Sequence, residues 1–387
     1  MSSNVGDEQD IRVAWLLPSL RLGFYIQPVF RELSILLSSQ MRVFTGEWPG
    51  FVPGCEDSFS LQIVGRTLYI KSPKSGISGY GFGFGLPSLA IIPQILNFNP
   101  TVIFTNTFTL WTLVAIVLKP WKRWKVIVVY SGSSPNVDNQ KLPLRKLMAP
   151  QMDAFITNSQ AGKAYLVDTL QVQEEKVFAR PYQIPDQQAL QQVTEDSSQD
   201  LLGDLKRPVF LYIGQIVRRK GIPFLLEACS ILEQKGYQNY TVIIVGDGID
   251  REEVEGWSRD RGLADRVRWV GWVQYGELGN YFQVADVFVF PTLEDIWGMV
   301  VLEAMIFGKP VLCSKWAGAF EMIVEGENGY VFDPHEPEKL ADLMSLFIQQ
   351  PELIETMGKR SQVEITPYTP KSSAQFLSGV VKFVLDN

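Results

Sequence analysis

The chain has 387 residues, a formal net charge of −7, an isoelectric point near 5.1 and a mean hydropathy of +0.04. This length suits two domains, and a hydrophobic fraction of 46% is enough for two cores. The acidic balance argues against general nucleic-acid binding, which needs a basic face. The three cysteines, Cys55, Cys229 and Cys313, have no paired spacing, so they imply neither a disulfide framework nor a zinc site and fit a reducing cytoplasm.

Short runs of β-branched residues alternate with helical patterns in the first half of the chain, which indicates parallel βαβ units. We predict strands at residues 11–17, 42–44, 102–104, 126–130 and 154–157. Gly23 falls in the loop after the first strand, and Ser159 fits a helix N-cap after the last. The aromatic–glycine run at residues 79–86 is either a mobile loop with a binding role or a turn with its aromatic side chains tucked inward.

The longest apolar run, residues 108–118, is shorter than the roughly 20 residues that span a bilayer. It ends in residues 119–125, where Trp alternates with Lys and Arg, a mixture that settles at lipid headgroups. The competing interpretation is a buried helix followed by a solvated basic turn. The first ten residues are polar and acidic, without the plan of a signal peptide, so we expect a cytoplasmic protein. The headgroup interpretation would place it at the inner face of the membrane.

The polar stretch at residues 188–203 contains few apolar residues, which is typical of an interdomain linker. It separates an N-terminal domain, residues 1–187, from a C-terminal domain, residues 204–368. A last helical pattern, about residues 372–385, lies in the closing segment 369–387.

The second half predicts strands at residues 209–213, 241–245, 267–270, 287–290, 311–313 and 329–332. Gly214 and a basic cluster ending in Lys220 follow the first of them, just before a helix that starts near Ile222. A cation beside a helix N-terminus can hold a diphosphate, although a solvated basic loop has the same composition. Gly246 and Gly248 follow the next strand, but Arg251 replaces the third glycine of a dinucleotide motif, which argues against a dehydrogenase.

Two carboxylates, Asp295 and Glu303, lie eight positions apart at the next strand-to-helix junction. Apolar residues at helical spacing begin after Gly298, so residues 298–300 should form the first helical turn. The unpaired N–H groups of such a turn favour an anion, and Glu303 would reach hydroxyls of the same ligand. The alternative is an acidic loop before a helix with a surface Glu.

These motifs resemble those of retaining nucleotide-sugar glycosyltransferases with the GT-B fold, in glycosyltransferase family four ("glycosyl transferases group one"). The family's acidic-x7-acidic signature begins Glu-Gly-Phe-Gly; here residues 295–297 are Asp-Ile-Trp, while Gly298 and residues 302–305 match. Lys220 matches the family's diphosphate-binding Lys, but Gln215 stands where an Arg is expected, and Arg218 or Arg219 would have to compensate. The resemblance runs from about residue 209 to 345.

The resemblance implies an α/β GT-B fold: two Rossmann-like domains with parallel sheets facing a central cleft, and a terminal helix that returns to the first domain. Lys220 and backbone N–H groups would stabilise the departing diphosphate, Glu303 would hold the ribose and Asp295 the sugar. The expected substrate-binding residues are Gly23, Gly214, Gln215, Arg219, Gly246, Gly248, Val273, Trp297, Gly298, Met299 and Val300.

The implied function is that of a retaining hexosyltransferase that needs no metal and no cofactor. The only histidine, His335, lies in a Pro-His-Glu-Pro turn, where we expect a surface residue and not a metal ligand. The donor would be a UDP-, GDP- or ADP-sugar. The acceptor would be a glycan, a lipid-linked molecule or a polysaccharide precursor, bound mainly by the first domain. A lipid-linked acceptor would imply peripheral membrane contact. A non-catalytic GT-B nucleotide-sugar-binding or scaffold protein is the main alternative, and a sugar-nucleotide epimerase a weaker one.

Overall fold

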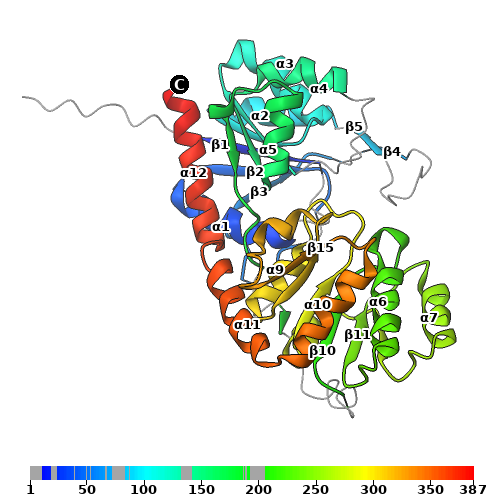
Figure 1. Ribbon diagram of the computed structural model, residues 1–387. Helices are drawn as coiled ribbons and strands as arrows, with labels where there is room; N and C mark the ends of the chain where they lie inside the picture. Colours follow the sequence, from blue (N-terminus) through cyan, green and yellow to red (C-terminus); the bar gives the residue numbers. More distant parts are fainter. Residues whose placement is uncertain are drawn as a thin grey trace, which may run out of the picture. The chain divides into compact units, whose positions relative to one another are not determined.

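The computed structural model divides the chain into two compact units, each built on a parallel β-sheet (Figure 1). The structure describes residues 11–387 except 19–23, 39, 49, 53, 66–67, 72–82, 87, 132–141, 186, 188–189 and 192–204; at 24, 68–71 and 83–86 it describes the backbone alone. The first unit holds the described residues up to Gln183 together with Tyr368–Asn387. The second holds Ile184–Pro367.

The first unit contains a seven-stranded parallel sheet in the order β3-β2-β1-β6-β7-β8-β9. Its strands are β1 (Val13–Leu17), β2 (Met41–Thr45), β3 (Ser60–Ile63), β6 (Val102–Asn106), β7 (Lys125–Tyr130), β8 (Ala154–Thr157) and β9 (Val177–Ala179). The chain proceeds from β1 toward one edge and then returns to add β6 on the other side, which is the order of a doubly wound fold. A separate antiparallel pair is formed by β4 (Leu68–Lys71) and β5 (Gly83–Leu86).

Both faces of this sheet are covered by helices, as a parallel sheet requires. Alternate residues of β1 point to opposite faces, and Trp15 and Leu16 belong to two different hydrophobic clusters. The Trp15 face packs against α1 (Gln27–Leu36) and α12 (Pro370–Asp386), whereas the Leu16 face packs against α2 (Ile91–Phe98) and α3 (Leu110–Lys122). The unit is completed by α4 (Leu142–Met148) and α5 (Gln160–Ala164).

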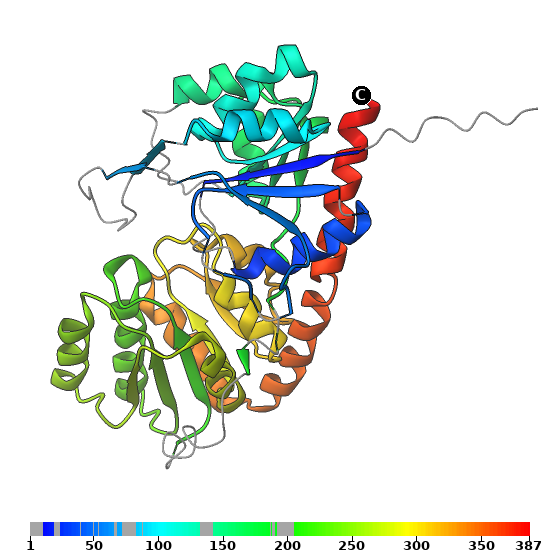
Figure 2. The ribbon, with the colours of Figure 1, turned by 180° about the vertical axis from the view of Figure 1, so that it is seen from behind.

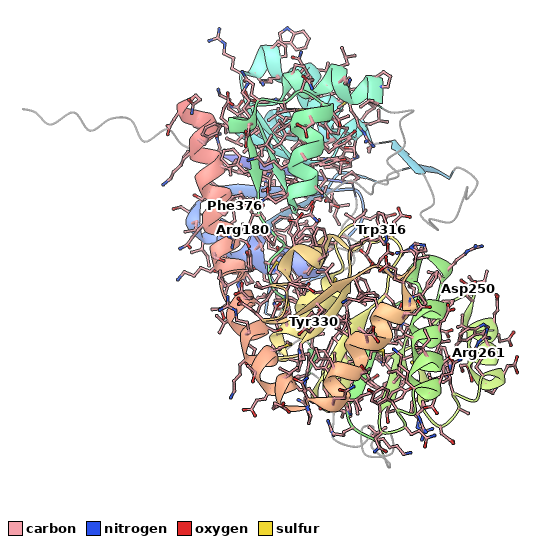
Figure 3. All side chains as sticks on the ribbon, viewed as in Figure 1. Arg180, Asp250, Arg261, Trp316, Tyr330 and Phe376 are labelled. Atoms are coloured by element: carbon pink, nitrogen blue, oxygen red, sulfur yellow. The ribbon has the colours of Figure 1, made fainter. Side chains whose placement is uncertain are left out.

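The C-terminal helix α12 belongs to the first unit although the preceding residues belong to the second. The Thr369 side chain caps it by accepting a hydrogen bond from the Ser372 N–H at 3.1 Å. Arg180, just after β9, donates to Ser372 Oγ at 2.8 Å, and its guanidinium carbon lies 5.6 Å from the ring centroid of Phe376 (Figure 3). Contacts from two distant parts of the sequence therefore hold α12 on this sheet.

The second unit contains a six-stranded parallel sheet in the order β12-β11-β10-β13-β14-β15. Its strands are β10 (Val209–Ile213), β11 (Thr241–Val245), β12 (Val267–Gly271), β13 (Val287–Phe290), β14 (Val311–Ser314) and β15 (Gly329–Phe332). Its helices are α6 (Ile222–Gln234), α7 (Arg251–Asp260), α8 (Leu278–Val284), α9 (Met299–Ile306), α10 (Pro337–Gln349) and α11 (Glu352–Ile365). Figure 1 shows α6 and α10 in front of this sheet, and Figure 2, from behind, shows α9 on the opposite face.

Each of the eleven strands predicted from the sequence begins and ends within two residues of an observed strand. The strands β3, β4, β5 and β9 were not predicted, and residues 79–82 and most of the predicted linker, residues 188–203, lie outside the described part of the chain. The interpretation of a helix that ends at residue 118 before a basic turn was wrong in part: α3 continues through Pro120 to Lys122, so residues 119–122 are its last turn. The expected terminal helix is present as α12.

Candidate active site

In the second unit the predicted site residues follow β10, β11, β12 and β13. Because these strands are parallel, their carboxyl ends meet at one edge of the sheet, which is where ligands bind in open α/β folds. The chain leaves β10 toward β11 on one side and adds β13 on the other, so the loops after β10 and β13 flank a topological switch point. Those two loops carry the charged residues.

Lys220 is a buried cation at this edge. It ends the short 3-10 helix Arg218–Lys220 that follows β10, and its side chain forms an ion pair with Asp295 from the loop after β13. The Nζ atom also lies 5.0 Å from the centroid of the Phe290 ring, a cation–π contact. Burial lowers the pKa of Lys220, and the neighbouring Asp295 carboxylate opposes that shift. The pair thus joins two residues that are 75 positions apart in the chain.

Arg219 brings a second buried cation beside Gln215. Its Nη2 donates to Gln215 Oε1 at 3.3 Å, and its Nη1 donates to the Glu294 carbonyl at 3.2 Å. The Arg219 carbonyl accepts from the Leu293 N–H at 2.7 Å, which ties the loop after β10 to the loop after β13. Arg218, by contrast, is exposed. Of the two arginines that could compensate for Gln215, the structure therefore places Arg219 next to it.

The loop after β13 holds Asp295 through its backbone and its side chain. The Asp295 N–H donates to the carbonyl of Trp316, labelled in Figure 3, at 3.1 Å, and the Trp297 N–H donates to Asp295 Oδ1 at 3.1 Å. Gly298 then adopts a φ of +98°, and a Cβ there would lie 2.7 Å from Phe290 Cε1. This position, where the chain turns into α9, therefore has no room for a side chain.

The first turn of α9 begins at Met299, one residue after the predicted start at Gly298. Its backbone N–H groups are those that a helix leaves without intrahelical partners, and they carry the positive end of the helix dipole. Trp297 is buried, whereas Met299 and Val300 are partly exposed at the same edge. An anion at this position would meet both the N–H groups and the neighbouring cations.

Glu303 is a buried carboxylate on the second turn of α9. Burial raises its pKa from 4.5 to about 7, and a hydrogen bond from Tyr275 partly offsets this increase. Tyr275 follows β12, and its hydroxyl donates to Glu303 Oε1 at 3.2 Å. The carboxylate is thus fixed at one oxygen and poised to change its charge near neutral pH.

The glycine turns bring the remaining backbone close together. Gly246 has a φ of +139°, and a Cβ there would lie 1.9 Å from the Gly214 carbonyl oxygen. Gly246 N donates to the Gly271 carbonyl at 2.7 Å, and a Cβ on Gly248 would lie 2.1 Å from the Ile216 oxygen. The loops after β10, β11 and β12 therefore pack backbone to backbone, which only glycine permits here.

The structure places most, but not all, of the predicted site residues. Gln215, Arg219, Lys220 and Asp295 form one cluster, Glu303 is held separately by Tyr275, and Val273 is partly exposed after β12. Gly23 lies outside the described residues. The contacts of Phe290, Thr292 and Tyr275 were not predicted from the sequence, because nothing in the spacing of these residues indicates which groups they contact.

His335 is exposed, and its Nδ1 lies 3.0 Å from Asp333 Oδ1. In the part of the chain that the structure describes, no three His, Cys, Asp or Glu side chains converge as a metal-ligand set.

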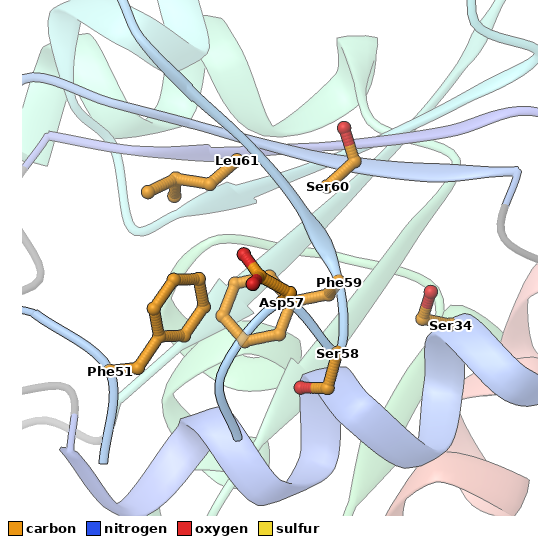
Figure 4. Close-up of a pocket in the computed structure, with 7 residues that line it drawn as sticks. All are labelled: Ser34, Phe51, Asp57, Ser58, Phe59, Ser60 and Leu61. Carbon is orange, nitrogen blue, oxygen red and sulfur yellow. The ribbon is translucent and has the colours of Figure 1, made fainter.

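The first unit contains a hollow of about 480 Å³ lined by Ser34, Phe51, Asp57, Ser58, Phe59, Ser60 and Leu61 (Figure 4). Ser60 and Leu61 begin β3, so the hollow lies at the amino end of that strand. Ligand sites of doubly wound folds lie at the carboxyl ends, and we therefore do not assign the acceptor to this hollow.

Residues 193–363 match the sequence profile of the family described as "Glycosyl transferases group 1". The matched segment has the sequence pattern of this family, and the chain has the GT-B fold. The fold is shared with Anabaena HepE, solved in complex with UDP, at a TM-score of 0.73 and 17% identity over 96% of this chain and 100% of that one. It is also shared with sucrose-phosphate synthase from Thermosynechococcus elongatus, at a TM-score of 0.74 and 19% identity over 97% and 99% of the two chains.

Among curated relatives of the family, the chain is 28% identical to alpha-D-kanosaminyltransferase of Streptomyces kanamyceticus over 46% of each chain. It is 28% identical to alpha-monoglucosyldiacylglycerol synthase of Acholeplasma laidlawii over 43% of this chain and 41% of that one. The chain thus spans less than half the length of these two relatives. The family assignment rests on the second unit, which carries the cation cluster and Glu303.

Proposed function

We propose that the chain is a retaining hexosyltransferase that transfers a sugar from a nucleotide-diphosphate sugar to a glycan, lipid-linked or polysaccharide-precursor acceptor. The observation that carries the proposal is the cluster of Arg219, Lys220 and Asp295 beside the first turn of α9. Two buried cations and a helix N-terminus at the carboxyl edge of a doubly wound sheet match the charge of a diphosphate.

Stabilisation of the leaving group is the main contribution of this cluster. As the bond between the anomeric carbon and the diphosphate breaks, negative charge grows on the diphosphate oxygens. Lys220 and Arg219 would neutralise that charge, and the N–H groups of Met299 and Val300 would donate to it. These groups are held in place before the reaction by the contacts to Phe290, Glu294 and Gln215, so little reorganisation is needed.

Asp295 and Glu303 would position the rest of the donor. Asp295 pairs with Lys220 in the structure, and a bound diphosphate would share this cation and leave a carboxylate oxygen for the sugar hydroxyls. Glu303, in its ionised form, would accept hydrogen bonds from the ribose hydroxyls while Tyr275 holds its other side. Together the two carboxylates would fix the donor at both ends of the diphosphate.

The donor and its requirements are part of the proposal. HepE of Anabaena has been solved with UDP, with UDP and glucose, and with UDP-glucose, so we place UDP-sugars ahead of GDP- and ADP-sugars. We propose that the two cations make a divalent metal unnecessary, and that activity therefore survives a chelator.

The acceptor side is assigned to the N-terminal domain, residues 1–187, with donor binding in residues 204–368 and a linker at 188–203. A relative named as a diacylglycerol glycosyl synthase makes a lipid-linked acceptor one reasonable class, and the enzyme would then work in the cytoplasm at the inner face of the membrane.

The test is release of nucleotide from UDP-, GDP- and ADP-sugars, with and without a chelator and with membrane extract as the acceptor source. Lys220→Ala and Glu303→Ala should abolish release, whereas Lys235→Ala, an exposed lysine of the same unit, should not. NMR of the product would show whether the anomeric configuration of the donor is retained. Donor binding without release under every condition would instead identify a non-catalytic nucleotide-sugar-binding protein.

A further inference from the structure

Helix α3 in the first unit is apolar on its outer face as well as on its inner face. Trp111 and Ala115 are buried against the sheet. On the opposite side Leu113, Val117 and Trp121 recur every four residues and are 36%, 53% and 75% exposed. A helix on the surface of a water-exposed protein normally carries polar residues on that side. The outer face of α3 is therefore both apolar and exposed, a combination that is typical of a surface that binds another molecule.

Helix α4 extends the same surface. Leu144 and Leu147 are 43% and 72% exposed, and Figures 1 and 2 both show α4 beside α3. Lys119 near the end of α3 donates to the Gln151 carbonyl at 2.8 Å, just after α4, so the two helices are also tied by a contact. We call the exposed side chains of Leu113, Val117, Trp121, Leu144 and Leu147 the α3–α4 surface.

The charge around this surface is opposite to that of the whole chain. Residues 101–153 contain seven Lys and Arg and two acidic residues, Asp138 and Asp153, in a protein with a net charge of −7; Asp153 pairs with Lys119. Lys122, Arg123 and Lys146 are exposed beside the apolar residues. Within the described residues no ion pair joins any of these three to a carboxylate. Cations thus flank an apolar face.

We infer that the α3–α4 surface binds the headgroup region of a bilayer that contains anionic lipid. Exposed Trp and Leu side chains would enter the boundary between headgroups and acyl chains, and the flanking cations would meet lipid phosphates. The 13 residues of α3 span about 20 Å, so the helix would lie along the interface. None of the described helices is long and apolar enough to cross a membrane.

This inference names the membrane partner of the proposed glycosyltransferase, but it rests on a surface of the first unit that shares no residue with the donor site. Each cation near an anionic membrane contributes about 1 kcal/mol, which is about a fivefold change in the partition coefficient. Neutralising two cations should therefore weaken binding roughly 25-fold.

The experiment is co-sedimentation of the full chain with vesicles of phosphatidylcholine, with and without one-third phosphatidylglycerol. Trp121→Ser with Leu147→Ser should abolish binding to the anionic vesicles, and Lys122→Gln with Arg123→Gln should weaken it by the factor above. Leu89→Ser, at a site 78% exposed, and Lys382→Gln on α12 are the matched controls and should bind like the wild type. Unchanged melting temperatures would show that all variants fold.

Binding that is strong with phosphatidylglycerol and lost at high salt supports the inference. Equal binding to neutral vesicles, equal binding by the Trp121 variant, or no binding at all would overturn it. A wild type that is dimeric, fails to bind vesicles and becomes monomeric on Trp121→Ser would assign the surface to a second copy of the chain instead. UDP binding, measured without vesicles, tests the proposed function separately.

Discussion

Replacing Glu303 with Gln should stabilise the ligand-free protein at alkaline pH while weakening nucleotide binding. Burial raises the pKa of Glu303 from 4.5 in the unfolded chain to about 7 in the fold. Above pH 7 the wild type must therefore keep a charged carboxylate in a buried site, whereas the amide of the variant is neutral and of similar size. The variant removes the cost of that charge but also removes the charged acceptor that we assign to the ribose.

The magnitude follows from the shift in pKa. A shift of about 2.5 pH units corresponds to roughly 3 kcal/mol in the free energy of unfolding. Between pH 4.5 and 7 the folded state binds the proton and the unfolded state does not, so the stability of the wild type falls as pH rises through this window. The advantage of Glu303→Gln is then below about 1 kcal/mol at pH 5 and reaches its full size at pH 8.

The assay is the melting temperature at the two pH values. For a unit of this size, roughly 3 kcal/mol shifts the midpoint upward by about 6 to 12 °C at pH 8. Glu253→Gln, an exposed carboxylate on α7, is the matched control and should show no such dependence on pH. Loss of the charged acceptor should weaken nucleotide binding by roughly 10- to 100-fold. An equal shift at both pH values, or destabilisation at pH 8, would show that the buried charge of Glu303 does not set the pH dependence of stability.

Three further variants test other contacts of the site. Tyr275→Phe removes the hydrogen bond that lowers the pKa of Glu303, so the pH midpoint of nucleotide binding should move upward; an unchanged midpoint would mean that the contact does not set the charge. Gly246→Ala forces a Cβ against the Gly214 carbonyl and should lower the free energy of unfolding, measured with denaturant, by about 3 kcal/mol or more. Gly236 has a positive φ but open space around it, so Gly236→Ala should lower that free energy by about 1 kcal/mol. Equal losses in the two variants would contradict the close packing at Gly246. Lys220→Met leaves the Asp295 carboxylate without its cation and should lower the free energy of unfolding by roughly 3 kcal/mol. Adding Asp295→Asn should recover part of that loss. Additive losses in this double-mutant cycle would show that the two residues are not energetically coupled.

The strands of the two central sheets could be predicted from the sequence because they are buried on both faces. Such strands read as short, continuous runs of β-branched and aromatic residues, as in β10 and β11, where every position is buried. The missed strands lack that signal. β3 is an edge strand with exposed ends, β9 has three residues, and β5 is half glycine. Their pairing is decided by the neighbouring strand and not by their own composition.

The sequence indicates where the candidate site residues lie along the chain but not which contacts they make. Strand-to-loop junctions and glycine spacing located Lys220, Asp295 and Glu303. Arg218 and Arg219 are neighbours in the sequence, and only the fold shows that Arg219 is the buried one beside Gln215. The hydrogen bond from Tyr275 to Glu303 joins residues 28 positions apart, and no local pattern encodes it.

In the proposed function, buried cations at the carboxyl edge of the second sheet hold a nucleotide diphosphate. Calorimetric titration of UDP into the wild type, Arg219→Met and Lys220→Met tests it most directly, with Lys235→Met as the control. UDP should bind saturably to the wild type and the control, and at least tenfold more weakly to each of the other two variants. UDP, GDP and ADP all failing to bind, or binding that is equal in all four proteins, would contradict it.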